Sequence, residues 1–104
     1  MQTEVDYKQN ELNKMLAILD QQAQKFLESF NITKNIISVT ELYATKFEDA
    51  FVEFYLLTEK YKYTHTEVMW QGHMDYIGIA LFQYQSIFEE VQIRTGYKFK
   101  KLNF

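Results

Sequence analysis

The longest run of residues without a charged side chain is Tyr76-Ile-Gly-Ile-Ala-Leu-Phe-Gln-Tyr-Gln-Ser-Ile-Phe88. Apolar residues in and around this run are spaced alternately three and four apart: Trp70, Met74, Ile77, Leu81, Tyr84, Phe88 and Val91. Such steps average about 3.5 residues, the repeat of helices that pack side by side in a left-handed seam. The pattern therefore predicts a long helix here, buried along this seam.

Two earlier segments share the same spacing. The first contains Leu12, Leu16, Leu19, Ala23, Phe26 and Phe30, and the second contains Ile36, Thr40, Tyr43, Phe47, Ala50, Phe54, Leu57 and Tyr61. None of the three segments shows the alternation of period two that marks a half-buried strand. We therefore predict an all-α fold, an up-down-up three-helix bundle with long heptad-patterned helices, and dimerisation as one way to complete it.

Capping signals give the expected boundaries. Ser38-Val39-Thr40-Glu41 and Thr64-His65-Thr66-Glu67 both fit the capping box that begins a helix, and Gly96 suits the left-handed position that ends one. We expect one domain over residues 1–104, with helices at about 4–30, 39–62 and 65–95 and a basic, aromatic tail at 97–104. Residues 31–38 fit either a helical or an extended connection.

Composition excludes several classes of function. The chain has no Cys, which excludes a disulfide scaffold, a zinc-thiolate site and a thiol nucleophile. Its net charge is −3, and Lys98, Lys100 and Lys101 make the tail +3, so the remainder is −6. An acidic body argues against nucleic-acid binding. The uncharged run is too short to span a membrane, and residues 1–11 contain no apolar signal region, so we expect a cytoplasmic protein.

The sequence lacks the common catalytic and metal-binding patterns. Neither His65 nor His73 has a Glu three residues before it, no His-Glu-x-x-His motif occurs, and no glycine-rich phosphate loop is present. We therefore expect no metal, no cofactor and no small-molecule substrate, and a protein that is not an enzyme. The alternative is a histidine phosphotransfer domain that uses His73, which the pattern places in the middle of a helix beside Gly72.

The last predicted helix carries more apolar residues than a three-helix bundle needs. A helix that is apolar nearly all round is usually covered all round. The cover can be a second copy of the chain, the tail after Gly96 or a different protein, and we favour a homodimer. We predict a non-enzymatic protein–protein interaction module, an adaptor or a small inhibitor, that uses an apolar, aromatic helix face. The expected contact residues are Tyr55, Tyr76, Phe82 and Tyr84.

One tripeptide resembles a known family. Trp70-Gln71-Gly72 is similar to the Trp-x-Gly motif of small type VII secretion substrates, which lies in the turn of a helical hairpin. Here the capping box at Thr64 predicts a helix around the tripeptide, and that family's C-terminal Tyr-x-x-x-Asp/Glu signal is missing, so membership is not assigned. In size, acidity and helicity the chain also resembles bacteriocin immunity proteins and small phage-encoded inhibitors, an analogy at the level of the fold.

Overall fold

The computed structural model describes residues 4–33, 36–61 and 67–102, and it is mostly helical. The helices are α1 (Glu4–Glu28), α2 (Glu41–Tyr61) and α3 (Ile77–Thr95). The strands of the described residues form two antiparallel hairpins: β1 (Asn31–Thr33) with β2 (Ile36–Ser38), and β3 (Glu67–Trp70) with β4 (His73–Tyr76). The mainly helical architecture agrees with the prediction, whereas the strands do not.

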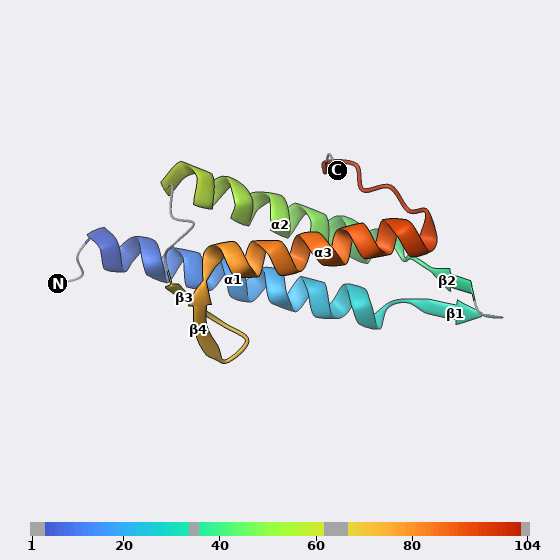
Figure 1. The fold of residues 1–104 in the computed structure, drawn as a ribbon, viewed down its shortest axis with the longest axis horizontal. Coiled ribbons are helices and arrows are strands. Elements are labelled where there is room, and N and C mark those ends of the chain that lie inside the picture. The colour runs from blue at the N-terminus through green and yellow to red at the C-terminus, as the bar shows by residue number, and fades with distance from the viewer. Residues whose placement is uncertain (1–3, 34–35, 62–66, 103–104) are drawn as a thin grey trace.

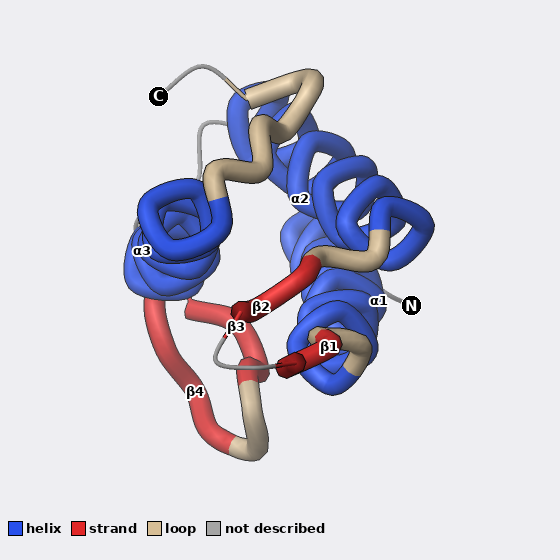
Figure 2. Tube along the Cα trace, turned by 90° about the vertical axis from the view of Figure 1, so that its right-hand side faces the viewer, coloured by secondary structure: helices blue, strands red, loops and turns tan. Residues whose placement is uncertain are grey.

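The helices lie lengthwise in an elongated molecule of 56 × 26 × 20 Å. Figure 1 shows α1 and α3 running in one direction and α2 in the other, with the two hairpins near opposite ends. Seen along the long axis, α3 lies opposite the closely paired α1 and α2 (Figure 2). Side chains rather than backbone contacts therefore have to join α3 to the other two helices.

The buried face of α1 matches the predicted seam. Leu12, Leu16, Leu19, Ala23 and Phe26 are all buried, and Phe30 is partly buried. The helix ends at Glu28 rather than at residue 30, because the backbone N–H and the hydroxyl of Ser29 both donate to the carbonyl of Phe26. The carbonyl of Ser29 accepts a hydrogen bond from the hydroxyl of Thr40, at 3.2 Å, which joins the two ends of the first hairpin.

The buried face of α2 is rotated from the predicted one. Phe47 and Phe54 are buried as expected, but their buried neighbours are Ala44, Glu48, Phe51 and Thr58. The predicted capping box at Ser38 is wrong, because Ser38 ends β2 and the helix begins at Glu41. The carbonyl of Thr40 accepts the first helical hydrogen bond, from the N–H of Ala44 at 3.0 Å.

Residues 67–76 form a hairpin, so the prediction of a single helix over 65–95 is wrong in its first part. Gln71 and Gly72 have φ of 51° and 84°, the two positive values that a two-residue type I′ turn requires. The alternation of exposed Glu67, buried Val68, exposed Met69 and buried Trp70 is the strand signal that the helical spacing concealed. The capping box at residues 64–67 falls largely outside the described residues.

In its described residues, 31–33 and 36–38, the connection between α1 and α2 takes the extended alternative. Ile32 pairs with Ile37 in the antiparallel ladder of β1 and β2. At the other end of the chain, Gly96 has φ of 74° and its N–H donates to the carbonyl of Gln92 at 2.9 Å, which confirms the predicted left-handed end of α3. The chain then turns back along the helices.

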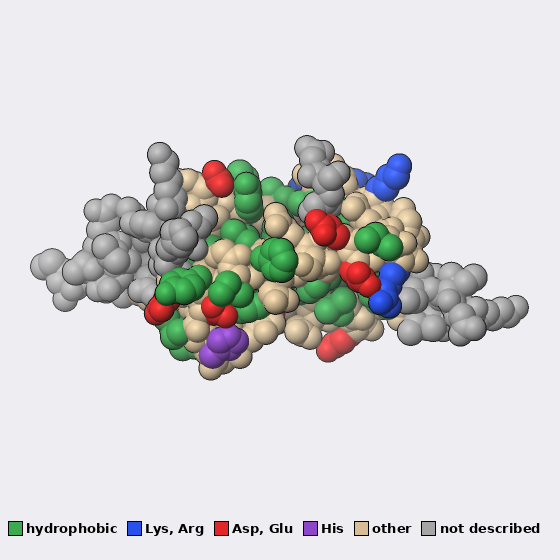
Figure 3. Space-filling model, in the orientation of Figure 1, with side chains coloured by type: hydrophobic (Ala, Val, Ile, Leu, Met, Phe, Trp, Pro, Cys, Tyr) green, Lys and Arg blue, Asp and Glu red, His purple; other side chains and the backbone are tan. Residues whose placement is uncertain are grey.

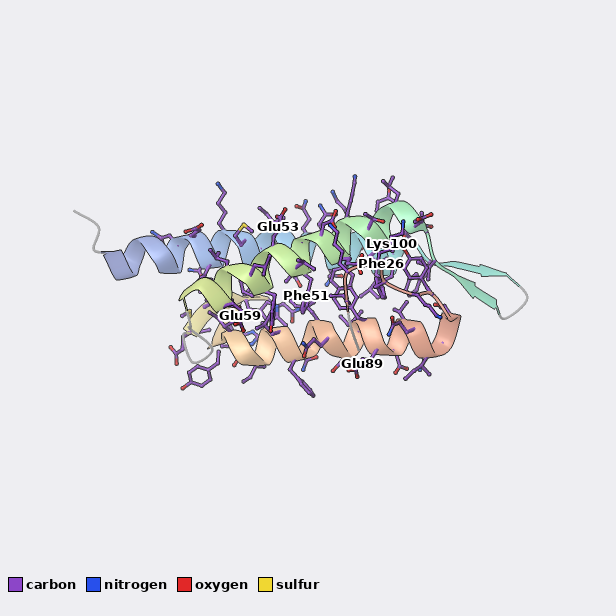
Figure 4. All side chains as sticks on the ribbon, turned by 90° about the horizontal axis from the view of Figure 1, so that it is seen from above. Phe26, Phe51, Glu53, Glu59, Glu89 and Lys100 are labelled. Atoms are coloured by element: carbon purple, nitrogen blue, oxygen red, sulfur yellow. The ribbon has the colours of Figure 1, made fainter. Side chains whose placement is uncertain are left out.

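Aromatic rings fill the space between α3 and the other helices. The ring of Phe88 stacks on that of Phe47 at 4.3 Å between centroids and meets the edge of Phe51 at 5.1 Å. Phe26 of α1 lies 5.4 Å from Phe47. In Figure 4, Phe26 and Phe51 lie between the helices, whereas Glu89 lies on the outer side of α3. The large rings therefore set the distance at which α3 packs.

The turn at Gly72 gives the first prediction. Replacing Gly72 by Ala should lower the free energy of unfolding by about 1–2 kcal/mol, because a Cβ at positive φ is strained. No atom lies within 4 Å of the added Cβ, so the loss reflects backbone strain alone. Urea denaturation measures it, and Gly72→Asn, which tolerates this conformation better, should lose less. Unchanged stability of the Ala variant would contradict the turn.

Candidate functional site

The outward face of α3 exposes several large apolar side chains. Ile93 is 80% exposed, Phe82 66% and Ile79 43%. The opposite face of the same helix holds Tyr84 and Phe88, which are buried. The helix is therefore apolar on two faces, and the fold of this chain covers one of them.

We define the outward strip by the residues that repeat along this exposed face. They are Ile79, Phe82, Ser86, Glu89 and Ile93. Their steps of three, four, three and four place them on one side of the helix. Figure 3 shows apolar side chains along this side of the molecule, separated by polar and acidic ones. Three of its five side chains are apolar, as a helix–helix contact requires and a solvated helix face does not.

A groove between α1 and α3 borders the strip. Its volume is about 490 Å³, with apolar residues on α1 and α3 and polar residues along the α3 side. The apolar lining consists of Leu27, Phe30, Ile87 and Val91. On the rim, the guanidinium of Arg94 donates to Glu90 at 2.6 Å, which balances that carboxylate within the chain. The groove extends the apolar surface beyond the strip.

At the N-terminal end of α3, a polar network joins the hairpin to α1. The hydroxyl of Tyr84 donates to the carboxylate of Asp20 at 2.7 Å and accepts the indole N–H of Trp70 at 2.9 Å. The amide of Gln71 donates to the same Asp20 oxygen at 3.1 Å. Tyr84 is therefore a buried structural residue, and the prediction that it contacts a partner is wrong.

Burial also controls the ionisation of Tyr84. Desolvation raises the pKa of its phenol well above the ordinary value, and the nearby carboxylate of Asp20 acts in the same direction. The phenol therefore stays protonated at neutral pH and keeps its role as a donor to Asp20. The network fixes the start of α3 against α1.

The other predicted contact residues lie in different places. Tyr76 ends β4, three residues before Ile79, and is exposed. Tyr55 lies on α2, where its ring stacks on that of Phe51 at 6.3 Å. Phe82 and Tyr76 thus belong to the region of the outward strip, and Tyr55 does not. Sequence reasoning left out Ile79 and Ile93 as contacts, although both lie off the predicted seam.

His73 does not occupy the position that the phosphotransfer alternative requires. It begins β4, exposed, with its Nε2 3.4 Å from a carboxylate oxygen of Asp75. The premise of a histidine in the middle of a helix is therefore wrong. Among the described residues, no group of three or more His, Cys, Asp and Glu side chains lies close enough together to hold a metal ion.

Comparison of the chain with protein-family models, with curated proteins and with solved structures gave no match. The tripeptide Trp70-Gln71-Gly72 lies in a β-turn, so our placement of it inside a helix is wrong. In the part of the chain that the structure describes, none of the helices has the length and apolar character needed to cross a membrane.

The polar network gives the second prediction. Tyr84→Phe should lower the free energy of unfolding by about 1–3 kcal/mol, because it leaves the buried indole N–H of Trp70 without its acceptor. The native chain should also lose stability as the pH rises above about 10, since unfolding then releases a proton that the folded state holds.

Urea denaturation between neutral pH and pH 11 measures both effects. The Tyr84→Phe variant should show a smaller loss at high pH than the native chain. Tyr76→Phe, at an exposed tyrosine, is the matched control and should change stability by less than about 0.5 kcal/mol. Equal stability of the two variants would show that the network contributes nothing.

Proposed function

We propose that the chain is a non-enzymatic protein-interaction module, an up-down-up bundle with heptad-patterned packing, that pairs with a second copy through the outward strip of α3. The observation that carries the proposal is the exposure of Ile79, Phe82 and Ile93 at heptad spacing on one helix face. A strip of this kind fits between the side chains of a second helix with the same strip.

The strip is self-complementary when the two helices run antiparallel. Ile79 and Ile93 each lie seven residues from Ser86. If the helices cross at Ser86, Ile79 of each copy meets Ile93 of the other, as two-fold symmetry requires. The small side chain of Ser86 lets the two helices approach each other. Its hydroxyl already donates to the carbonyl of Phe82 at 3.0 Å, so burying Ser86 in the contact leaves no hydrogen-bond donor without an acceptor.

Repulsion between carboxylates favours the antiparallel pairing of the two α3 helices over a parallel one. In a parallel pair, Glu89 of one copy would face Glu89 of the other, and the two carboxylates would repel. In the antiparallel pair, Glu89 faces Phe82 of the second copy. Its methylene groups can cover the aromatic ring while its carboxylate stays in water at the edge of the contact.

The neighbouring groove enlarges the proposed contact. A single helix face is small beside the roughly 800 Å² that each partner of a stable complex buries. The apolar lining of the α1–α3 groove, formed by Leu27, Phe30, Ile87 and Val91, lies beside the strip and adds to it. An adaptor or small inhibitor in the cytoplasm is the class of protein that such a surface suits, because it offers contacts and no reacting group.

The test is the mass of the chain in solution. Size-exclusion chromatography with light scattering should give a dimer for the native chain at tens of micromolar. Phe82→Glu should shift it to a monomer, because a second carboxylate at the contact costs about 2 kcal/mol or more, roughly a thirtyfold weaker dimer.

Leu42→Glu is the matched control. Leu42 is 60% exposed, close to Phe82 in exposure, but lies at the start of α2. The control should leave the dimer intact. A native chain that is monomeric throughout this concentration range would refute the pairing.

A further inference from the structure

The tail, residues 97–102, completes the aromatic core between α2 and α3. Phe99 is only 5% exposed, and its ring meets the edges of Phe88 at 4.7 Å and of Phe26 at 6.2 Å. Figure 4 shows the tail returning between α2 and α3, with Lys100 beside α2. A position in the core is thus filled from the tail, which is neither helix nor strand, instead of from a helix.

A buried carboxylate of α2 faces the tail. Glu48 is 3% exposed, and its Oε2 accepts the backbone N–H of Lys101 at 3.0 Å. A carboxylate removed from water needs a hydrogen-bond donor, and here a main-chain N–H of the tail supplies one. Because the donor is a backbone group, Glu48 recognises the peptide backbone rather than a particular side chain.

Two ion pairs flank this hydrogen bond. The ammonium of Lys100 lies 2.9 Å from the carboxylate of Glu41, and that of Lys101 pairs with Asp49. All four side chains are exposed, so each pair adds little affinity and weakens in salt. The pairs set the register of the tail and favour basic residues after the aromatic one.

We propose that the place the tail occupies between α2 and α3, a slot formed by Glu41, Glu48, Asp49 and Phe88, binds a short peptide segment of a partner protein, with the order aromatic, lysine, lysine, apolar. The chain's own Phe99-Lys100-Lys101-Leu102 is its exchangeable occupant. The match between a basic segment and the acidic face formed by Glu41, Glu48 and Asp49 identifies the chemistry of the ligand.

Exchange does not require the bundle to open. The contacts with the slot come from consecutive residues that a single turn at Gly96 joins to α3. They resemble the contacts of a short linear peptide, in which one aromatic anchor supplies most of the affinity and the polar contacts supply register. The segment can leave while the hydrogen bonds of every helix stay in place.

The slot continues into a groove along α2. This groove has a volume of about 400 Å³ and lies beside Leu102. Its walls include Phe51, Val52, Tyr55, Leu56 and Gln85. A partner segment longer than the tail would contact Tyr55 here. This surface is separate from the outward strip, so the two proposals can fail independently.

The experiment uses a fluorescent synthetic peptide, Tyr-Lys-Phe-Lys-Lys-Leu, titrated with the full chain and followed by anisotropy. The Phe99→Ala chain should bind it at least about tenfold more tightly than the native chain, because the native tail competes for the slot. A second variant, Lys100→Glu with Lys101→Glu, loosens the tail without removing a core ring and should also bind more tightly than the native chain.

Two controls define the slot. A peptide with Ala in place of Phe keeps its charge and should bind at least about tenfold more weakly, which separates the slot from general attraction of a cation to an acidic protein. Phe82→Glu should leave peptide binding unchanged. Failure of both tail variants to bind the peptide, or equal binding of the Phe and Ala peptides, would overturn the proposal.

Discussion

The contact between the stacked rings of Phe47 and Phe88 is the interaction on which the rest of the structure depends. It joins α2 to α3 at 4.3 Å between ring centroids, and Phe26, Phe51 and Phe99 surround it. Rings of this size hold α3 farther from its neighbours than aliphatic side chains would. The aromatic cluster, together with the other buried residues of α3, therefore determines where that helix lies.

Two consequences follow from this spacing. The cluster is too wide for three helices to close, so the tail contributes Phe99 to it. The rings also reach only one face of α3, and Tyr84 with Asp20 fixes the rotation of that helix at its N-terminal end. The strip from Ile79 to Ile93 therefore faces outward on the folded chain.

Helical periodicity predicted the parts of the fold in which the apolar residues follow the helical spacing alone. The seam of α1, from Leu12 to Phe26, is buried as predicted, and Gly96 ends α3 as expected. The hairpin at 67–76 was missed because Trp70, Met74 and Ile77 fit the helical spacing by coincidence. The turn itself is formed by Gln-Gly, which is a weaker turn signal than Asn-Gly.

The candidate surface was predicted in part. An excess of apolar residues on the last helix identified Phe82, but periodicity alone could not show that Tyr84 points inward to Asp20, a residue distant in the chain. From the sequence, the tail after Gly96 was one of three segments or partners that could cover the last helix. The structure shows that the tail fills the slot between α2 and α3, while the outward strip of α3 remains exposed.

Cross-linking at Ser86 tests the central claim most directly, because the native chain contains no Cys. A Ser86→Cys substitution places one thiol where the two antiparallel helices are proposed to cross, at a separation that a disulfide can bridge. Under mild oxidation this variant should form a covalent dimer in high yield, whereas Leu42→Cys should not. If the Ser86→Cys chain remains uncross-linked, or links no faster than the Leu42→Cys chain, α3 does not pair as proposed.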